Sequence, residues 1–137
     1  MKAAYPTSLD TAAAIAALLT YNADGLIPAI AQQAGTGEVL MMAWMNQDAV
    51  VETLTTGRVC YFSRSRGKLW RKGESSAQVQ TLIDFRWDCD GDTVLLQVEQ
   101  KGVACHTGRH NCFFNAVRDD KAQVIADVEI DPDDLYG

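Results

Sequence analysis

A predicted β-hairpin over residues 79–99 restricts the folds that this chain can adopt. Apolar and polar residues alternate along residues 79–87, and residues 93–99 (TVLLQVE) form a second apolar run. Between them, Asp90-Gly91-Asp92 is typical of a turn. In the first strand we expect Val79, Thr81, Ile83, Phe85 and Trp87 on one face, and Gln80, Asp84 and Arg86 on the other.

Other segments add strands and helices to this hairpin. Short apolar runs predict strands at residues 26–31, 38–45 and 59–63. Residues 34–37 (AGTG) are typical of a hairpin turn. Asn46 is a favourable N-cap and Gly57 is favourable just past a helix end, so a helix is expected between them. The fold class is therefore α+β, with a mostly antiparallel sheet and few helices.

The N-terminal region has two interpretations. Lys2 followed by the apolar residues 12–19 resembles a signal peptide. Against this, Ser8 or Asp10 could cap a helix at the start of the apolar stretch, and we favour a helix packed on the domain. Without a signal peptide the expected location is the cytoplasm, where four cysteines need not form disulfides.

Length and composition indicate one globular domain over residues 1–137. Hydrophobic residues make up 47% of the chain and charged residues 22%, as in ordinary globular proteins. No apolar run approaches the roughly 20 residues that cross a bilayer, so no membrane association is expected. The net charge of −6 argues against nucleic-acid binding. From Arg118 on, the chain is acidic, and we expect this tail to be poorly ordered or loosely docked.

Positive charge is nevertheless concentrated in one segment. Six of the 12 Lys and Arg residues lie between residues 58 and 72, uninterrupted by an acid. A solvated charged loop is the ordinary explanation. The contrast with the acidic remainder favours a site for a small anion such as a phosphate group. The candidate ligands are Ser63, Arg64, Arg66, Lys72 and Ser75.

Two kinds of metal ligand are interleaved between residues 88 and 112. Asp88, Asp90 and Asp92 are hard oxygen ligands suited to Mg²⁺ or Ca²⁺, and they share one face if the backbone is extended. A polar hairpin turn is the alternative explanation for the last two. Cys89, Cys105 and Cys112 are soft ligands suited to Zn²⁺, although their spacing is not that of a zinc finger.

The remaining cysteine and the two histidines differ in expected role. Cys60 lies in an apolar run and is interpreted as a core residue. His106, beside Cys105, could either fill an open zinc position or carry protons. His110 is expected to be an exposed loop histidine.

Several segments together resemble the phosphoribosyl-AMP cyclohydrolases of histidine biosynthesis. The resemblance covers residues 25–114, in the order found in that family. The segments that carry it are AWMN (43–46), YFSRSR (61–66), LWRKGESS (69–76), DCDGD (88–92), VEQKG (98–102) and ACHTGRHNCFF (104–114). The chain departs from the family pattern at Ala77 and Gln78, where Gly and then His or Asn are usual.

The resemblance implies a fold, a reaction and a set of ligands. The expected reaction is zinc-dependent hydrolysis of the N1–C6 bond in the adenine ring of N1-(5-phosphoribosyl)-AMP. The implied fold is a barrel-like sheet in an intertwined homodimer that shares zinc ligands between chains. Zinc ligands would be Cys89, Cys105 and Cys112, and Mg²⁺ ligands Asp88, Asp90 and Asp92. His106 would be the catalytic proton carrier, with Arg64, Arg66 and Lys72 holding phosphate.

Other functions fit the sequence less well. A zinc nucleobase deaminase would carry an HxE…PCxxC signature, which this chain lacks. A structural zinc module would need a closed four-ligand site. A secreted domain held by disulfides would need a paired Cys60.

Overall fold

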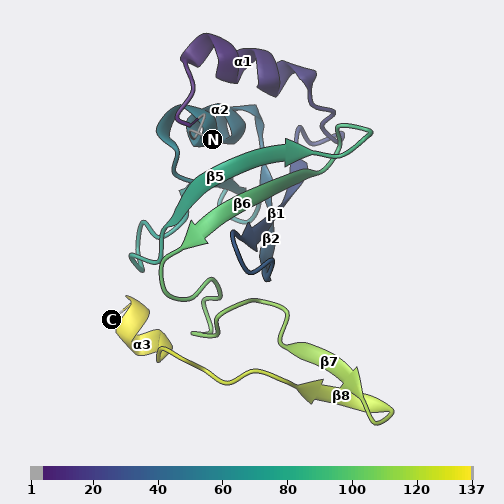
Figure 1. Cartoon of the computed structure of the whole chain (residues 1–137), viewed down its shortest axis with the longest axis vertical. Coiled ribbons are helices and arrows are strands. Elements are labelled where there is room, and N and C mark those ends of the chain that lie inside the picture. Colours follow the sequence, from purple (N-terminus) through teal and green to yellow (C-terminus); the bar gives the residue numbers. More distant parts are fainter. Residues whose placement is uncertain (1–4, 137) are drawn as a thin grey trace.

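The computed structural model describes residues 5–136, so Lys2 and Gly137 lie outside the described part. The described chain is α+β, as predicted (Figure 1). Its helices are α1 (Leu9–Leu18), α2 (Gln47–Thr56) and α3 (Pro132–Tyr136). Its strands are β1 (Ile27–Gln33), β2 (Val39–Met45), β3 (Cys60–Ser63), β4 (Lys68–Arg71), β5 (Gln80–Trp87), β6 (Val94–Gln100), β7 (Asn115–Arg118) and β8 (Lys121–Val124).

The central sheet has the strand order β2-β1-β6-β5. Its pairs are antiparallel except for β1 and β6, which run parallel. Strands β3 and β4 form a separate ribbon, as do β7 and β8. Residues 5–136 thus form an open sheet with β2 and β5 at its edges and no closed barrel. The expected barrel-like arrangement is corrected accordingly.

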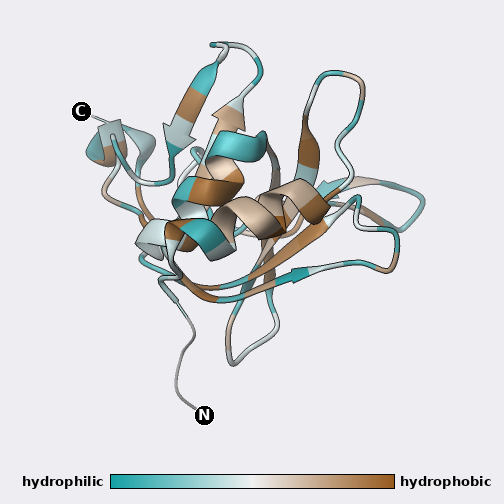
Figure 2. Cartoon of the chain, turned by 90° about the horizontal axis from the view of Figure 1, so that it is seen from above, coloured by the Kyte–Doolittle hydropathy of each residue, from teal (hydrophilic) through white to brown (hydrophobic). Residues whose placement is uncertain are grey.

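Helices α1 and α2 pack against each other at one end of the sheet, and α2 also contacts β2, β3 and β5 (Figures 1 and 2). Of the two N-cap candidates for α1, Ser8 is the cap, and α2 begins and ends where the sequence predicts. The Ser8 hydroxyl accepts a hydrogen bond from the Thr11 N–H, and the Asn46 side chain accepts one from Ala49. Gly57 ends α2 with a φ of 72°, a conformation that favours glycine. None of the helices in the described range is long and apolar enough to cross a membrane.

The predicted grouping of Thr81 and Ile83 with Phe85 on one face of β5 is wrong. Gln80 and Leu82 are buried, whereas Thr81 and Ile83 are exposed. The β5–β6 register shifts between Leu82 and Asp84, which marks a bulge that resets the alternation. Beyond the bulge Phe85 is buried, while Trp87 is largely exposed. Gln80 is tolerated in the core because it accepts a hydrogen bond from the Tyr61 hydroxyl at 2.7 Å and donates to the Gln100 side chain at 2.8 Å.

The acidic C-terminal tail has more structure than the sequence suggests. Strands β7 and β8 form a hairpin that projects away from the main body, and α3 returns towards it (Figure 1). Leu135 in α3 is only 7% exposed, so the end of the tail is docked. The hairpin itself is not covered, and Val117 is 78% exposed.

Candidate active site and metal ligands

The three aspartates converge in the turn between β5 and β6. One carboxylate oxygen from each of Asp88, Asp90 and Asp92 lies within 4.8 Å of the others, and all three residues are exposed. The Gly91 N–H donates to the Asp88 carbonyl at 3.0 Å, and the Asp92 N–H donates to the Asp88 carboxylate at 3.0 Å. Of the two arrangements considered from the sequence, the turn brings the carboxylates together and the extended strand does not. The residues that form this turn are therefore also the candidate metal ligands.

Interactions within the turn alter the pKa values of Asp88 and Asp92 in opposite directions. Hydrogen bonding to Asp88, with repulsion from Asp88 and Asp90, raises the pKa of Asp92. Desolvation alone would raise the pKa of Asp88, but hydrogen bonds from Asp92, Thr93 and Gly91 outweigh it and lower that pKa. Close like charges are relieved either by a proton or by a bound cation. The donor set fits Mg²⁺ or Ca²⁺.

Cys105 and Cys112 come together in the loop that follows β6. Cys105 is buried and Cys112 half-buried. Burial, reinforced by the Cys105 thiol, raises the pKa of Cys112 to about 12, and Lys72 acts against this shift. The Cys112 N–H donates to the Leu40 carbonyl in β2 at 2.7 Å, and the Thr107 hydroxyl lies 3.1 Å from the Cys105 sulfur. Two soft ligands are thus fixed side by side at the β2 edge of the sheet.

Cys89 does not join them within one chain. It is exposed in the β5–β6 turn, next to the aspartates. Strand β6 lies between this turn and the Cys105 loop, and a strand of that length spans roughly 20 Å. Within residues 5–136 only the aspartates form a group of three close metal-ligating side chains. The three-cysteine set is therefore divided between two ends of the molecule.

The two histidines of the loop have different surroundings. His106 is exposed, immediately after Cys105. His110 does not match the expected exposed loop histidine, because its side chain is only 34% exposed and its Nδ1 lies 2.9 Å from the Glu38 carboxylate. The Asn111 side chain donates to the same carboxylate at 2.7 Å. Desolvation would raise the pKa of Glu38, but the bonds from Asn111 and His110 prevail and lower it.

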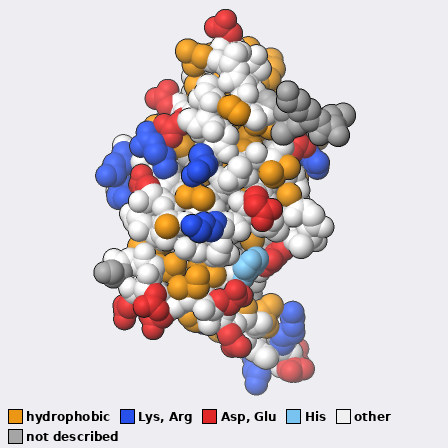
Figure 3. Space-filling view, turned by 60° about the vertical axis from the view of Figure 1, so that its left-hand side comes forward, with side chains coloured by type: hydrophobic (Ala, Val, Ile, Leu, Met, Phe, Trp, Pro, Cys, Tyr) orange, Lys and Arg blue, Asp and Glu red, His pale blue; other side chains and the backbone are white. Residues whose placement is uncertain are grey.

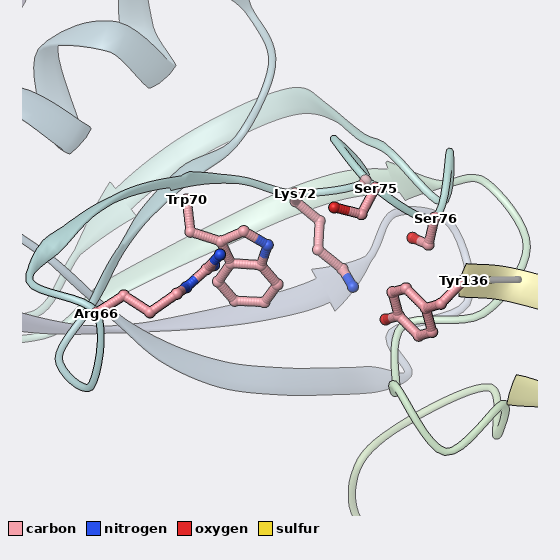
Figure 4. Close-up of a pocket in the computed structure, with 7 residues that line it drawn as sticks. Arg66, Trp70, Lys72, Ser75, Ser76 and Tyr136 are labelled. Atoms are coloured by element: carbon pink, nitrogen blue, oxygen red, sulfur yellow. The ribbon is translucent and has the colours of Figure 1, made fainter.

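A basic pocket lies beside the β3–β4 ribbon (Figure 4). Its cavity of about 250 Å³ is lined by Arg66, Trp70, Lys72, Gly73, Ser75, Ser76 and Tyr136. Three of the five predicted phosphate ligands, Arg66, Lys72 and Ser75, are therefore brought together. Figure 3 shows Lys and Arg side chains gathered on one face of the main body. Sequence reasoning missed Trp70, Ser76 and Tyr136.

The other two predicted phosphate ligands lie outside this pocket. The Arg64 guanidinium sits 4.9 Å from the centre of the Trp44 ring. The Ser63 hydroxyl accepts a hydrogen bond from the Arg66 N–H at 3.3 Å and so orders the β3–β4 turn. Ser63 thus shapes the turn that carries Arg66, while Arg64 points to a different surface.

Lys72 connects the basic pocket to the cysteine loop. It is only 7% exposed, and its ammonium donates to the Ala104 carbonyl at 2.7 Å. Burial lowers the pKa of Lys72, while Cys112 and Cys105 act to raise it. A buried cation beside two thiols that can become anionic is electrostatically favourable. The basic pocket and the thiol pair are therefore neighbours, connected by Lys72.

Comparison with known proteins agrees with this arrangement. A model of the phosphoribosyl-AMP cyclohydrolase family matches residues 41–114. A phosphoribosyl-AMP cyclohydrolase of Paramagnetospirillum magneticum is 65% identical over 130 residues, which cover 95% of this chain and 98% of the relative. The phosphoribosyl-AMP cyclohydrolase of Alkalilimnicola ehrlichii is 65% identical over 90% of this chain and 87% of its own length. A third, from Magnetococcus marinus, is 65% identical over 88% of this chain and 94% of its own length.

These matches include the basic segment, the aspartate turn and the cysteine loop. The similarity extends over most of the chain and is not confined to a short motif. The resemblance inferred from the sequence is thereby confirmed. The chain belongs to the phosphoribosyl-AMP cyclohydrolase family of enzymes.

Proposed function

We propose that this enzyme hydrolyses the N1–C6 bond of the adenine ring in N1-(5-phosphoribosyl)-AMP, as a step of histidine biosynthesis in the cytoplasm. Family membership supports the substrate. The single observation that carries the proposal is the position of Lys72, which lines the basic pocket and also contacts the loop that holds Cys105 and Cys112. A bound phosphate group is thereby held next to a pair of metal-ligating thiols.

Three groups of residues have different roles in the proposed reaction. Arg66, Lys72 and Ser75 hold a phosphate of the substrate and so fix the position of the base. His106, exposed beside Cys105, moves a proton to the departing N1 side, because imidazole gains and loses protons near neutral pH. Asp88, Asp90 and Asp92 hold Mg²⁺.

Zinc binding requires a second chain in this proposal. Cys105 and Cys112 supply two thiolates from one subunit, and Cys89 of a second copy supplies the third. A zinc ion held by them would supply Lewis-acid activation of water. Two observations support sharing: Cys89 is exposed, and it is separated from the other thiols by the length of β6. A homodimer with two-fold symmetry then has two equivalent sites.

Turnover and metal dependence test the proposed reaction directly. Purified enzyme supplied with zinc and Mg²⁺ is mixed with phosphoribosyl-AMP, and ultraviolet absorbance follows the opening of the purine ring. We expect turnover that a zinc chelator abolishes and added zinc restores. No turnover by the fully metallated enzyme would refute the proposal.

Mixing two inactive variants tests the shared site. Cys89→Ala and Cys105→Ala should each be inactive alone. In a mixed dimer one site keeps all three cysteines, so unfolding and refolding them together should restore about a quarter of the wild-type activity. If all three ligands came from one chain, no mixture would regain activity. A mixture of Cys105→Ala with Cys112→Ala is the matched control and should stay inactive.

A further inference from the structure

The end of the chain contributes a side chain to the basic pocket. Every other lining residue comes from residues 66–76, whereas Tyr136 comes from the last turn of α3. In Figure 4 the Tyr136 ring lies beside the Lys72 ammonium and close to Ser76. The family match over residues 41–114 does not include this segment. The role of Tyr136 therefore has to be inferred from its position.

Specific contacts hold the C-terminal segment against the cysteine loop. The Glu129 and Ile130 N–H groups both donate to the Gly108 carbonyl, at 2.8 and 3.1 Å. The Arg109 guanidinium donates to the Ala126 carbonyl at 2.9 Å. Gly108 has a φ of +87°, and a Cβ there would clash with the Ile130 carbonyl oxygen. This close approach requires glycine, so the segment is fitted to the loop.

Leu135 completes the attachment and determines where Tyr136 lies. The Leu135 side chain is 7% exposed, and the neighbouring Tyr136 is 53% exposed. Tyr136 lines the cavity and is half-exposed, so its hydroxyl is accessible to a ligand. One apolar residue thus anchors the helix while the next presents a phenol to the cavity.

We propose that Tyr136 is a substrate-binding residue whose hydroxyl donates a hydrogen bond to a phosphate group held by Arg66, Lys72 and Ser75. This inference rests on the proposed function, because it assigns one phosphate of that substrate to the pocket. The residues that line the pocket are suited to a phosphate. Two cations and two serine hydroxyls offer hydrogen-bond donors. An ionised phosphate monoester offers only acceptors. The phenol adds one more donor from the opposite wall.

The test uses the full-length enzyme with Tyr136→Phe, which keeps the ring and removes the hydroxyl. Loss of a hydrogen bond to a charged group should weaken binding of ribose 5-phosphate by about tenfold, measured by calorimetry. With phosphoribosyl-AMP, KM should rise by about the same factor while kcat stays within about twofold, because the bond is made equally in the ground and transition states. Asp134→Glu, on the exposed side of α3, is the control and should match wild type.

A second variant separates the hydroxyl from its support. Leu135→Ala should loosen α3 and weaken ribose 5-phosphate binding to a similar degree, with the secondary structure of the main body retained in circular dichroism. Wild-type affinity for ribose 5-phosphate in Tyr136→Phe would overturn the inference, and so would failure of the wild type to bind it. If wild-type enzyme binds ribose 5-phosphate but does not turn over phosphoribosyl-AMP, the proposed function fails and the binding data alone decide the role of Tyr136.

Discussion

Ala77 occupies a backbone conformation that favours glycine. Its φ is 64°, and its N–H donates to the Gly73 carbonyl at 2.8 Å, which closes the turn after the basic segment. The left-handed conformation costs an L-residue other than glycine about 1 kcal/mol or more. The departure from the family pattern at this position is therefore a source of strain beside the pocket. It is tolerated because the turn is fixed on both sides by the neighbouring strands.

Replacing Ala77 by Gly should stabilise the fold. We expect the free energy of unfolding to rise by up to about 1 kcal/mol, because relief of strain exceeds the added entropy of the unfolded chain. Urea denaturation measures the change. Ala13→Gly, on the exposed face of α1, is the matched control and should lower the free energy of unfolding by about 1 kcal/mol. A loss of stability in both variants would contradict the argument.

The adjacent residues Cys105 and His106 should give different phenotypes. Cys105→Ala should lose zinc and activity together, because a ligand is removed. His106→Ala should keep zinc but lose rate by about 10²- to 10⁴-fold, the usual contribution of a proton carrier. Metal analysis of the purified variants, alongside the absorbance assay, distinguishes these outcomes. Loss of zinc in His106→Ala would make His106 a ligand instead.

Cys60→Ser provides the control for this pair. Cys60 is buried in β3, and burial raises the pKa of its thiol to about 12, so it stays protonated and inert. Both zinc content and rate should remain close to those of wild type.

At the level of elements, local signals predicted well and long-range ones did not. The helix caps at Asn46 and Gly57 depend on residues a few positions apart and were identified correctly, and Ser8 was one of two candidates for the cap of α1. The faces of β5 were not, because its bulge depends on pairing with β6, which the sequence of β5 alone does not reveal. The alternation of apolar and polar residues predicted which side chains of β5 share a face only as far as the bulge, where an extra residue is inserted.

The same distinction explains what was found of the site. Arg66, Lys72 and Ser75 lie in or just after the basic segment of an otherwise acidic chain, so the sequence alone indicated them. Glu38, just before β2, and Tyr136 in α3 reach the site through tertiary packing. A single glutamate before an apolar strand and a tyrosine near the end of the chain carry no local signal. Only the fold brings them to the loop and the pocket.

The contact between Glu38 and the cysteine loop makes stability depend on pH. The pKa of Glu38 is lowered from 4.5 in the folded state, so the unfolded chain binds more protons in the acid range. Its stabilisation is present above pH 4.5 and is lost as the pH falls through the lowered value. Glu38→Gln should be less stable than wild type at pH 7, and the difference should shrink towards pH 3.

Urea denaturation across this pH range provides the measurement. Glu74→Gln removes an exposed carboxylate and should change the free energy of unfolding by less than about 0.5 kcal/mol at every pH. A constant difference between wild type and Glu38→Gln from pH 7 to pH 3 would contradict the assignment.

At the scale of the whole molecule, the two groups of candidate metal ligands lie at opposite ends of β6. One end carries the aspartates with Cys89, and the other carries Cys105 and Cys112. Under the proposed function, a single subunit therefore holds parts of a zinc site that it does not close by itself. The β7–β8 hairpin, which begins three residues after Cys112, extends from the main body (Figure 1). Its Val117 and Val124 side chains are 78% and 54% exposed. Such a surface on a projecting arm is suited to covering by a second copy.

Val117→Asp tests whether this arm holds the proposed dimer together. Val117 is 78% exposed in the described chain, so a charge there should leave the fold of the subunit intact. If the residue is buried between copies, the charge should raise the dimer dissociation constant by at least about tenfold, because it would be desolvated without a partner. Sedimentation measures the dissociation constant, and zinc content and activity should fall with the dimer fraction.

Leu9→Asp makes the same change at a residue that is 65% exposed, in the first turn of α1, where a negative charge is favourable. It should remain dimeric and active. Equal dissociation constants for Val117→Asp and wild type would exclude the arm from the interface, and the shared zinc site would then require contact through another surface.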